Sequence, residues 1–403
     1  MDRIVIIGAG ASGIVSSIYA KNDNNEVIIL EKNSKPLKKL LITGNGKCNY
    51  FNDDFNIKHY YSSNLEKLSK VITKENKDKI LDFFDSIGIV PKIKNGYYYP
   101  SSSQAYSIYN ALLKEAELKG VKIKLDSKVI DIRKEDKFII KTENEIIKCD
   151  KVIISTGSKA YPKTGSEGDG YNFANKLNIN VNKVYPALVA LTSSNKMLKD
   201  LDGVRTNAKV TLSKDNKIIK EEVGELQFTK DSLSGICIYN LSTNMIDSNT
   251  YININLLNDF DINNKEEFIN IFNERIRKVK NRTITELLEG YLNYKIVNVI
   301  LKECNINPNK KYEELSNKEK ELLGSKLTNL QIKVEGTKDY NSSQVCGGGI
   351  SLEEVNIETF ESNKISGLYF IGELLDVVGE CGGYNLGFAF ISGMLSGMSV
   401  NND

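Results

Sequence analysis

Histidine is almost absent from this sequence. Its 403 residues include one histidine, His59, so a histidine-based catalytic triad or a metal site with several histidine ligands is close to excluded. The six cysteines are scattered and form no CxxC pair, which argues against a disulfide framework, a zinc ribbon and a dithiol redox centre. We therefore expect reduced thiols, as in the cytoplasm, and no bound metal.

Long hydrophobic runs and an excess of one charge are also missing. No stretch of about 18 apolar residues occurs, as a membrane-spanning helix would need, and the first residues lack the segments of a signal peptide. Lys plus Arg number 54 against 52 Asp plus Glu, a formal net charge of +2, which gives no overall attraction to nucleic acid or to an anionic membrane. We expect a cytoplasmic protein with a small-molecule substrate and no nucleic-acid or membrane partner; the sequence leaves the oligomeric state open.

The length and the hydrophobic periodicity predict an α/β protein with more than one domain. The pattern of strand 4–7, glycine turn 8–13, helix and strand 27–30 is the start of a doubly wound sheet. After about residue 188 alternating apolar residues predict a small β domain, and a helical period follows. The expected segments are 1–188 and 341–403 for a nucleotide-binding domain, 189–260 and 327–340 for an inserted β domain, and 261–326 for a helical subdomain.

The glycine turn after the first strand is the strongest local motif. Gly8, Gly10 and Gly13 follow the order GxGxxG, and Glu31 ends the next strand 18 residues later, near the spacing of a dinucleotide-binding fingerprint. Gly8 permits the tight turn, Gly10 lets the backbone approach a pyrophosphate, and Gly13 lets the helix pack on the strand. Glu31 can accept hydrogen bonds from ribose hydroxyls. This combination indicates dinucleotide binding but does not separate NAD from FAD.

Two more glycine-rich segments follow along the chain. The loop "GNGKCN" spans residues 44–49, directly after the ribose-binding strand. The stretch "GECGGYNLGFAFISG", residues 379–393, is a glycine turn that enters an apolar helix near the C-terminus. Such a turn leaves backbone N–H groups of the first helical turn unpaired, so it suits an anion or an electron-rich ring edge.

Four motifs, in order, carry a resemblance to a known family. The segment "LKKLLITGNGKCN" (37–49) resembles "GRKLLISGGGRCN" of the HI0933-like flavoproteins, also called aminoacetone oxidase-like or bile-acid flavin reductase-like enzymes. "YPKTGSEGDGY" (161–171), "GELQFTKDSLSG" (224–235) and "GLYFIGELLDVVGECGGYNL" (367–386) match the same family. The resemblance spans nearly the whole chain. It implies FAD bound by a Rossmann-type domain in two chain segments, with a β-barrel-like domain and its helical subdomain inserted between them.

The resemblance also implies which residues contact the cofactor. Glu373 would lie near its ribityl or pyrophosphate portion, and residues 382–386 would meet the isoalloxazine, where helix N–H groups stabilise negative charge on the reduced ring. The expected cofactor-binding residues are Gly8, Gly10, Ala11, Ser12, Gly13, Glu31, Lys32, Lys39, Leu40, Gly44, Asn45, Gly46, Lys47, Cys48, Asn49, Val129, Ser155, Thr156, Gly157, Gly372, Glu373, Gly383, Tyr384, Asn385 and Leu386.

The function that the resemblance implies is FAD-dependent oxidoreduction, with a hydride passing between flavin and a small organic substrate. Because the chain has one dinucleotide fingerprint and no dithiol, we expect NAD(P)H to dock transiently as the reductant. With histidine unavailable, Tyr161 and Lys163 are the expected catalytic proton donors. The alternatives are an amine oxidase of the aminoacetone type that uses oxygen, a flavin-binding regulatory protein, and an RNA-modifying flavoenzyme with a basic insert face.

The sequence also departs from the family pattern. Lys47 and Tyr97 stand where arginine is common, and Lys230 stands in place of a histidine. If those positions recognise substrate, the substrate of this protein differs from that of its relatives. Cys48, next to Lys47, is either a small packing residue or a thiol of lowered pKa.

Overall fold

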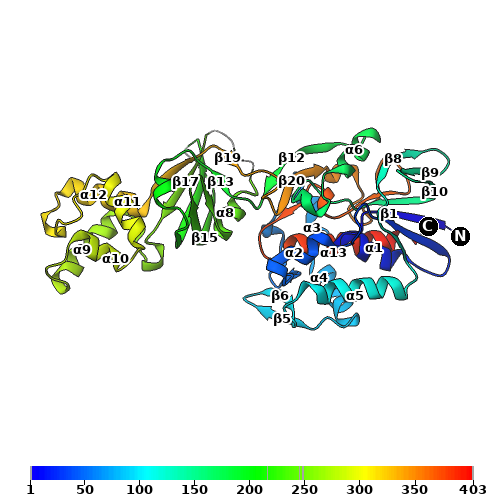
Figure 1. Ribbon diagram of the computed structural model, residues 1–403, viewed down its shortest axis with the longest axis horizontal. Helices are drawn as coiled ribbons and strands as arrows, with labels where there is room; N and C mark the ends of the chain where they lie inside the picture. The colour runs from blue at the N-terminus through cyan, green and yellow to red at the C-terminus, as the bar shows by residue number, and fades with distance from the viewer. Residues whose placement is uncertain (1, 216, 245, 247–248, 402–403) are drawn as a thin grey trace. The chain divides into compact units, whose positions relative to one another are not determined.

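A computed structural model describes residues 2–215, 217–244, 246 and 249–401. The chain forms two compact units (Figure 1): the first comprises Met1–Ala187 and Tyr340–Asp403, and the second comprises Leu188–Asp339. Each unit has its own hydrophobic core. The five-segment division expected from the sequence stays a prediction.

A five-stranded parallel sheet forms the centre of the first unit. Its strands lie in the order β21-β11-β1-β2-β7, which is the 3-2-1-4-5 order of a Rossmann-type fold. The apolar runs 4–7 and 27–30 are buried, as expected for parallel strands that are covered on both faces. The strand bounds are β1 (Asp2–Ile7), β2 (Asn25–Leu30), β7 (Lys122–Lys124), β11 (Lys151–Ile154) and β21 (Leu368–Phe370).

Two helices from opposite ends of the chain pack tightly beside this sheet. Helix α1 (Ala11–Ala20) follows the first glycine turn, and α13 (Tyr384–Ser399) follows the last. A Cβ atom on Gly393 would lie 2.4 Å from the carbonyl oxygen of Ser12, and one on Gly397 would lie 2.4 Å from that of Ser16. Glycine at both positions therefore lets the two helices approach, and this brings the C-terminal glycine turn to the first one.

Smaller elements complete the first unit. Three antiparallel strands form a sheet in the order β10-β9-β8, another three follow the order β3-β6-β5, and two pairs, β22-β4 and β12-β20, stand alone. The bounds are β3 (Phe51–Asn52), β4 (Tyr60–Tyr61), β5 (Pro91–Lys94), β6 (Tyr97–Pro100), β8 (Val129–Lys134), β9 (Phe138–Thr142), β10 (Ile146–Cys149), β12 (Val181–Ala187), β20 (Val345–Ile350) and β22 (Val378–Gly379), with helices α2 (Lys38–Ile42), α3 (Leu65–Ser69), α4 (Lys74–Ser86), α5 (Ala105–Leu118) and α6 (Asp169–Lys176).

The second unit combines an antiparallel sheet with helices. The sheet has the order β18-β17-β14-β15-β16-β13-β19, and its two edge strands are joined in the chain by Glu335 alone. The bounds are β13 (Leu191–Thr192), β14 (Arg205–Lys214), β15 (Lys217–Thr229), β16 (Ser232–Ser234), β17 (Thr250–Asn255), β18 (Leu330–Val334) and β19 (Gly336–Thr337), with helices α7 (Met197–Asp200), α8 (Ile236–Leu241), α9 (Lys265–Lys278), α10 (Ile284–Glu289), α11 (Tyr294–Glu303) and α12 (Asn317–Thr328).

Helix length and apolarity give one further finding. Across the described ranges, none of the helices combines the length and the apolarity needed to cross a membrane.

Candidate functional site

The first glycine turn shows two kinds of glycine. A Cβ on Gly8, whose φ is +105°, would lie 2.7 Å from the Ser155 carbonyl oxygen, and one on Gly13 would lie 2.1 Å from the Gly8 carbonyl oxygen. A Cβ on Gly10 would meet only the Ser155 carbonyl oxygen, at 3.9 Å. Gly8 and Gly13 therefore serve the close packing of the backbone, whereas Gly10 faces open space that a ligand can fill.

Glu31 lies at the same edge of the sheet as this turn. Its Oε2 accepts a hydrogen bond from the backbone N–H of Ala9 (2.8 Å), and its Oε1 accepts one from the backbone N–H of Asn33 (2.8 Å). No side chain of the described residues caps α1, so the first N–H groups of that helix are free for an anion. The uncapped start of α1 and the carboxylate of Glu31 are thus side by side.

Residues from three distant segments meet next to the start of α1. A Cβ on Gly372 would lie 2.5 Å from Ser12 Oγ. The neighbouring Glu373 is bound on both oxygens: Lys39 Nζ lies 2.9 Å from Oε2, and Ser158 Oγ donates to Oε1 at 2.7 Å. The structure therefore joins Lys39 and Glu373, which are 334 residues apart, in one half-buried ion pair.

The end of β11 supplies the next group of expected residues. Ser155 Oγ lies 2.9 Å from the carbonyl oxygen of Ile7 and 2.8 Å from that of Gly8, and its one hydroxyl proton is shared between them, which fixes the turn from behind. Thr156 Oγ1 is buried without a hydrogen-bond partner among the described residues. A Cβ on Gly157 would lie 2.9 Å from Ser166 Oγ. The Thr156 hydroxyl is covered by protein atoms, because a Cβ on Gly170 would lie 2.3 Å from its Oγ1.

The second glycine loop has an unusual backbone. Gly44, Asn45, Gly46 and Cys48 all have positive φ values, of 56°, 54°, 81° and 58°. Burial raises the pKa of the Cys48 thiol to about 12, so this cysteine is a packing residue and the alternative of a lowered pKa is wrong. The buried Leu40 anchors the preceding helix α2, while Lys47 is exposed.

This loop and the strand after it lie against the C-terminal glycine turn. A Cβ on Gly383 would lie 2.5 Å from the Phe51 carbonyl oxygen and 2.9 Å from the side-chain amide of Asn49. Asn52 Nδ2 donates to the carbonyl oxygen of Gly382 at 2.8 Å. The two glycine-rich segments, more than 300 residues apart in the sequence, therefore form one surface.

The turn itself is held from within. The Asn385 side chain accepts from the backbone N–H of Gly379 (2.8 Å) and donates to its carbonyl oxygen (2.8 Å). Among the described residues no side chain caps α13, so the N–H groups at its start, from Tyr384 to Leu386, are not bound by a capping side chain. The helix has 16 residues, and its dipole favours negative charge at this end.

His59 is a site residue that the sequence reasoning missed. Its ring stacks on that of Tyr384, with centroids 4.7 Å apart. Its Nδ1 lies 2.7 Å from Glu380 Oε2 and its Nε2 lies 2.9 Å from Asp54 Oδ2. His59 thus contacts Tyr384, an expected cofactor-binding residue, and the expectation that no histidine serves in proton transfer stays a prediction. The cause of the contact is the pairing of β4 with β22, two-residue strands too short to leave a periodic signal in the sequence.

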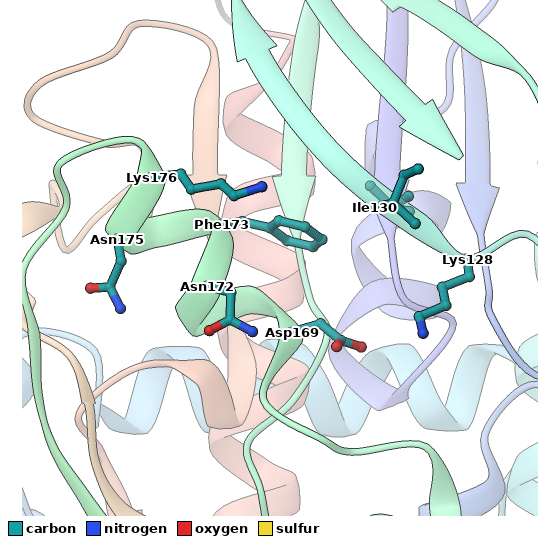
Figure 2. Close-up of a pocket in the computed structure, with 8 residues that line it drawn as sticks. Lys128, Ile130, Asp169, Asn172, Phe173, Asn175 and Lys176 are labelled. Carbon is teal, nitrogen blue, oxygen red and sulfur yellow. The ribbon is translucent and has the colours of Figure 1, made fainter. Parts of the chain in front are cut away.

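Val129 lines a cavity of about 480 Å³ between β8 and α6. Figure 2 shows Lys128 and Ile130 on the β8 side of this cavity and Phe173 and Asp169 on the α6 side. The segment leading to β8 runs beside Glu31, because the N–H of Ser127 donates to the Glu31 carbonyl oxygen at 2.8 Å. The cavity thus lies on the side of the sheet edge where Glu31 follows β2.

Lys32 lies close to this cavity. Its Nζ is 2.7 Å from Glu167 Oε2 and 2.7 Å from Asp169 Oδ2. Both carboxylates compete with a phosphate for this ammonium group, so the part of Lys32 in cofactor binding stays a prediction.

The expected catalytic residues lie on an exposed turn. Tyr161 is 38% exposed with φ at 53°, and Lys163 is exposed in the next turn of chain. This turn borders Asn33, whose Nδ2 donates to the Thr164 carbonyl oxygen at 3.3 Å. No hydrogen bond in the described part of the chain links Tyr161 or Lys163 to His59 or to the start of α13, and their catalytic role stays a prediction.

The sheet order, the glycine turn and Glu31 together define a Rossmann-type dinucleotide-binding protein. The model of the HI0933-like protein Rossmann domain matches residues 2–399. The chain therefore belongs to the HI0933-like family, which confirms the resemblance carried by its four motifs.

Relatives and solved structures extend this finding. The chain is 34% identical to the 3-dehydro-bile acid delta(4,6)-reductase of Clostridium scindens, over 99% of each chain. It is 29% identical to the ribosomal RNA dihydrouridine synthase of Escherichia coli, over 97% of this chain and 96% of that protein. Its structure is similar to that of the 3-ketosteroid-delta4-(5alpha)-dehydrogenase from Rhodococcus jostii RHA1, with a TM-score of 0.50 at 13% identity over 98% of this chain and 96% of that one. This last likeness concerns the fold alone.

Proposed function

We propose that the protein binds FAD and reduces a carbon–carbon double bond conjugated to a carbonyl group. The observation that carries this proposal is the meeting of the Gly44–Asn49 loop with the uncapped start of α13 at Gly383. A helix start of this kind favours negative charge, which is what a reduced flavin ring needs at its pyrimidine edge. The open space beside Gly10 and the free N–H groups of α1 both fit an extended dinucleotide.

The relatives favour the same chemistry. One is named for reducing delta(4,6) double bonds of a 3-dehydro bile acid, and the other for converting uridine of ribosomal RNA to dihydrouridine. A carbon–carbon double bond conjugated to a carbonyl occurs in both, and each product gains a hydride and a proton. We infer that this shared reaction, rather than either substrate, is the property that extends to the present chain.

When bound, FAD would carry the two electrons of the reaction, and the chain would bind and orient it. Glu31, which lies beside the start of α1, would accept hydrogen bonds from the ribose, and the free N–H groups of α1 would bind the pyrophosphate. The ion pair of Lys39 and Glu373 would orient the ribityl portion. Asn385 fixes the turn that presents the N–H groups of α13.

The proton requires a donor close to α13. Both nitrogens of His59 lie within hydrogen-bond distance of carboxylate oxygens, Nδ1 at 2.7 Å from Glu380 Oε2 and Nε2 at 2.9 Å from Asp54 Oδ2. Burial, reinforced by the charges of Asp54 and Glu380, raises the pKa of the Tyr384 hydroxyl, so the phenol keeps its proton. We propose that the stacked His59–Tyr384 pair holds the proton; Tyr161 and Lys163 are the alternatives from the sequence.

Further parts of the proposal follow the family resemblance. In this proposal NAD(P)H is the transient reductant. The seven-stranded sheet of the second unit is the barrel-like insert. The protein acts in a reducing compartment such as the cytoplasm. The direct succession of the edge strands β18 and β19 supports the barrel. Six free thiols support the compartment.

Anaerobic flavin spectroscopy tests the proposal. We expect the purified protein to release FAD on denaturation, and NADH or NADPH to bleach its absorbance. A conjugated enone or a uridine-containing RNA then restores the absorbance faster than oxygen does. Bleaching by an amine with rapid oxygen turnover and no response to NAD(P)H would instead identify the oxidase alternative, and recovery of FMN would refute the cofactor assignment.

A further inference from the structure

The hairpin of β5 and β6 presents an unusual face. In its register Lys94 pairs with Tyr97 and Lys92 pairs with Tyr99. Residues directly opposite each other and residues two apart share one face of a sheet, so two lysines and two tyrosines stand together. The opposite face carries Tyr98, which is buried against Tyr50 and Phe51.

This basic-aromatic face consists of Lys92, Lys94, Tyr97 and Tyr99, and its two half-buried tyrosines lie beside the candidate site. A Cβ on Gly382 would lie 2.9 Å from Tyr97 Cε1, and a Cβ on Gly44 would lie 3.8 Å from Tyr99 Cε1. The tyrosine rings therefore flank the surface where the two glycine-rich segments meet. The hairpin, labelled in Figure 1, thus borders the expected position of the flavin ring.

Charge distinguishes this face from a simple apolar platform. All four residues of β5 are exposed, and within the described residues neither Lys92 nor Lys94 lies within 4.0 Å of a carboxylate. Asp53, whose Cβ lies 3.9 Å from a Cβ placed on Gly96 in the hairpin turn, is paired with Lys77 at 2.9 Å. The two ammonium groups are therefore available to an anionic partner.

We propose that the basic-aromatic face binds single-stranded RNA, with bases stacked on the tyrosine rings and phosphates held by the lysines, so that one base reaches the site. Aromatic rings alternating with cations are what a single-stranded nucleic acid needs, because every base has a flat face and every nucleotide has a phosphate. A planar steroid would gain from apolar side chains instead. The net charge of +2 does not report on this local face. The view that the bound base is the substrate rests on the proposed function; the binding itself does not.

Anisotropy of a short fluorescein-labelled oligouridine, titrated with FAD-loaded protein, tests the proposal. We expect Tyr97→Leu or Tyr99→Leu to weaken binding by about five- to 150-fold, the range for one base–aromatic stack. Tyr97→Phe keeps the ring and retains the affinity. The double variant Lys92→Gln/Lys94→Gln lowers the slope of log affinity against log salt by about 1.4, which is two phosphates at about 0.7 each.

Matched controls keep the test specific. Tyr294→Leu and Lys119→Gln remove exposed residues of the same types outside the hairpin, and neither alters binding. Equal affinity of the wild-type protein and the hairpin variants overturns the proposal. Loss of affinity for a steroid enone, with oligouridine binding unchanged, overturns it as well.

The two proposals fail in different ways. If oligouridine binds through the hairpin but the reduced protein transfers no hydride to RNA or to a small enone, the proposed reaction is wrong and the RNA site stands. If a small enone is reduced while oligouridine binding ignores the hairpin substitutions, the RNA site is wrong and the reaction stands.

Discussion

Replacing Gly383 by alanine tests the geometry on which the flavin assignment depends. The residue has φ at +92°, and an added Cβ would lie 2.5 Å from the Phe51 carbonyl oxygen and 2.7 Å from the Phe51 carbonyl carbon. Both contacts are with backbone, which cannot rotate away as a flexible side chain could. The substitution therefore displaces either the start of α13 or the strand that follows the Gly44–Asn49 loop.

Two contributions make up the expected cost. A left-handed backbone costs an L-residue about 1–2 kcal/mol, and an overpacked contact adds about 1–3 kcal/mol. Gly88 separates them, because its φ is +85° and a Cβ there meets nothing within 4 Å. Gly88→Ala should therefore show the backbone contribution alone, and Gly383→Ala should show both.

Thermal unfolding and FAD titration measure the difference. At about 2–4 °C per kcal/mol for a domain of this size class, Gly88→Ala lowers Tm by roughly 2–8 °C with unchanged FAD affinity. Gly383→Ala lowers Tm by up to about 12 °C more, and its displaced turn weakens FAD binding by about 5–150-fold. If Gly383→Ala binds FAD as tightly as Gly88→Ala does, α13 does not face the cofactor.

Further substitutions and a labelling experiment probe other parts of the site. Glu31→Gln removes a charged acceptor, which contributes about 1.5–3 kcal/mol per hydrogen bond, so fluorescence titration should show FAD binding weakened by roughly 10–100-fold; an unchanged Kd would refute the ribose assignment. His59→Gln should slow flavin reoxidation by a conjugated acceptor about 10²-fold in stopped flow while FAD content stays intact, and a larger loss in Tyr161→Phe would favour the donor expected from the sequence. Because burial raises the pKa of Cys48 to about 12, little thiolate forms at neutral pH; iodoacetamide should label the half-buried Cys381 first, and rapid modification of Cys48 in the folded protein would contradict this order.

The sequence predicted the parts of the site that depend on local backbone geometry. Gly8, Gly10 and Gly13 stand at fixed spacing between a strand and a helix, and their roles in packing and in leaving space follow from the absence of a Cβ. The position of Glu31 follows in the same way, because this residue comes directly after the last residue of β2, Leu30. The start of the Rossmann-type sheet could be predicted because a strand–helix–strand unit is a local motif of about thirty residues, so all of its signals lie close together in the sequence.

Contacts between distant segments could not be predicted in this way. His59 and Glu380 are 321 residues apart, and Tyr97 reaches Gly382 from a hairpin. The strands β4 and β22, which bring His59 to Glu380, have two residues each, too few for an alternating pattern. A lone histidine carries no spacing information, so counting residue types underestimated the chemistry available at the start of α13.

Residues whose positions depend on local backbone geometry and residues brought together from distant segments have different consequences for function. The glycines that form the cofactor surface are constrained by contacts with backbone, as at Gly13 and Gly383, so other residues there disturb the fold itself. Tyr97 and His59 meet the same surface through side chains and can change without moving the backbone. Members of one family can therefore keep the cofactor site and differ in substrate. Tyr97 belongs to the second set, so we expect substrate choice in this protein to depend on the side chains that border the glycine surface.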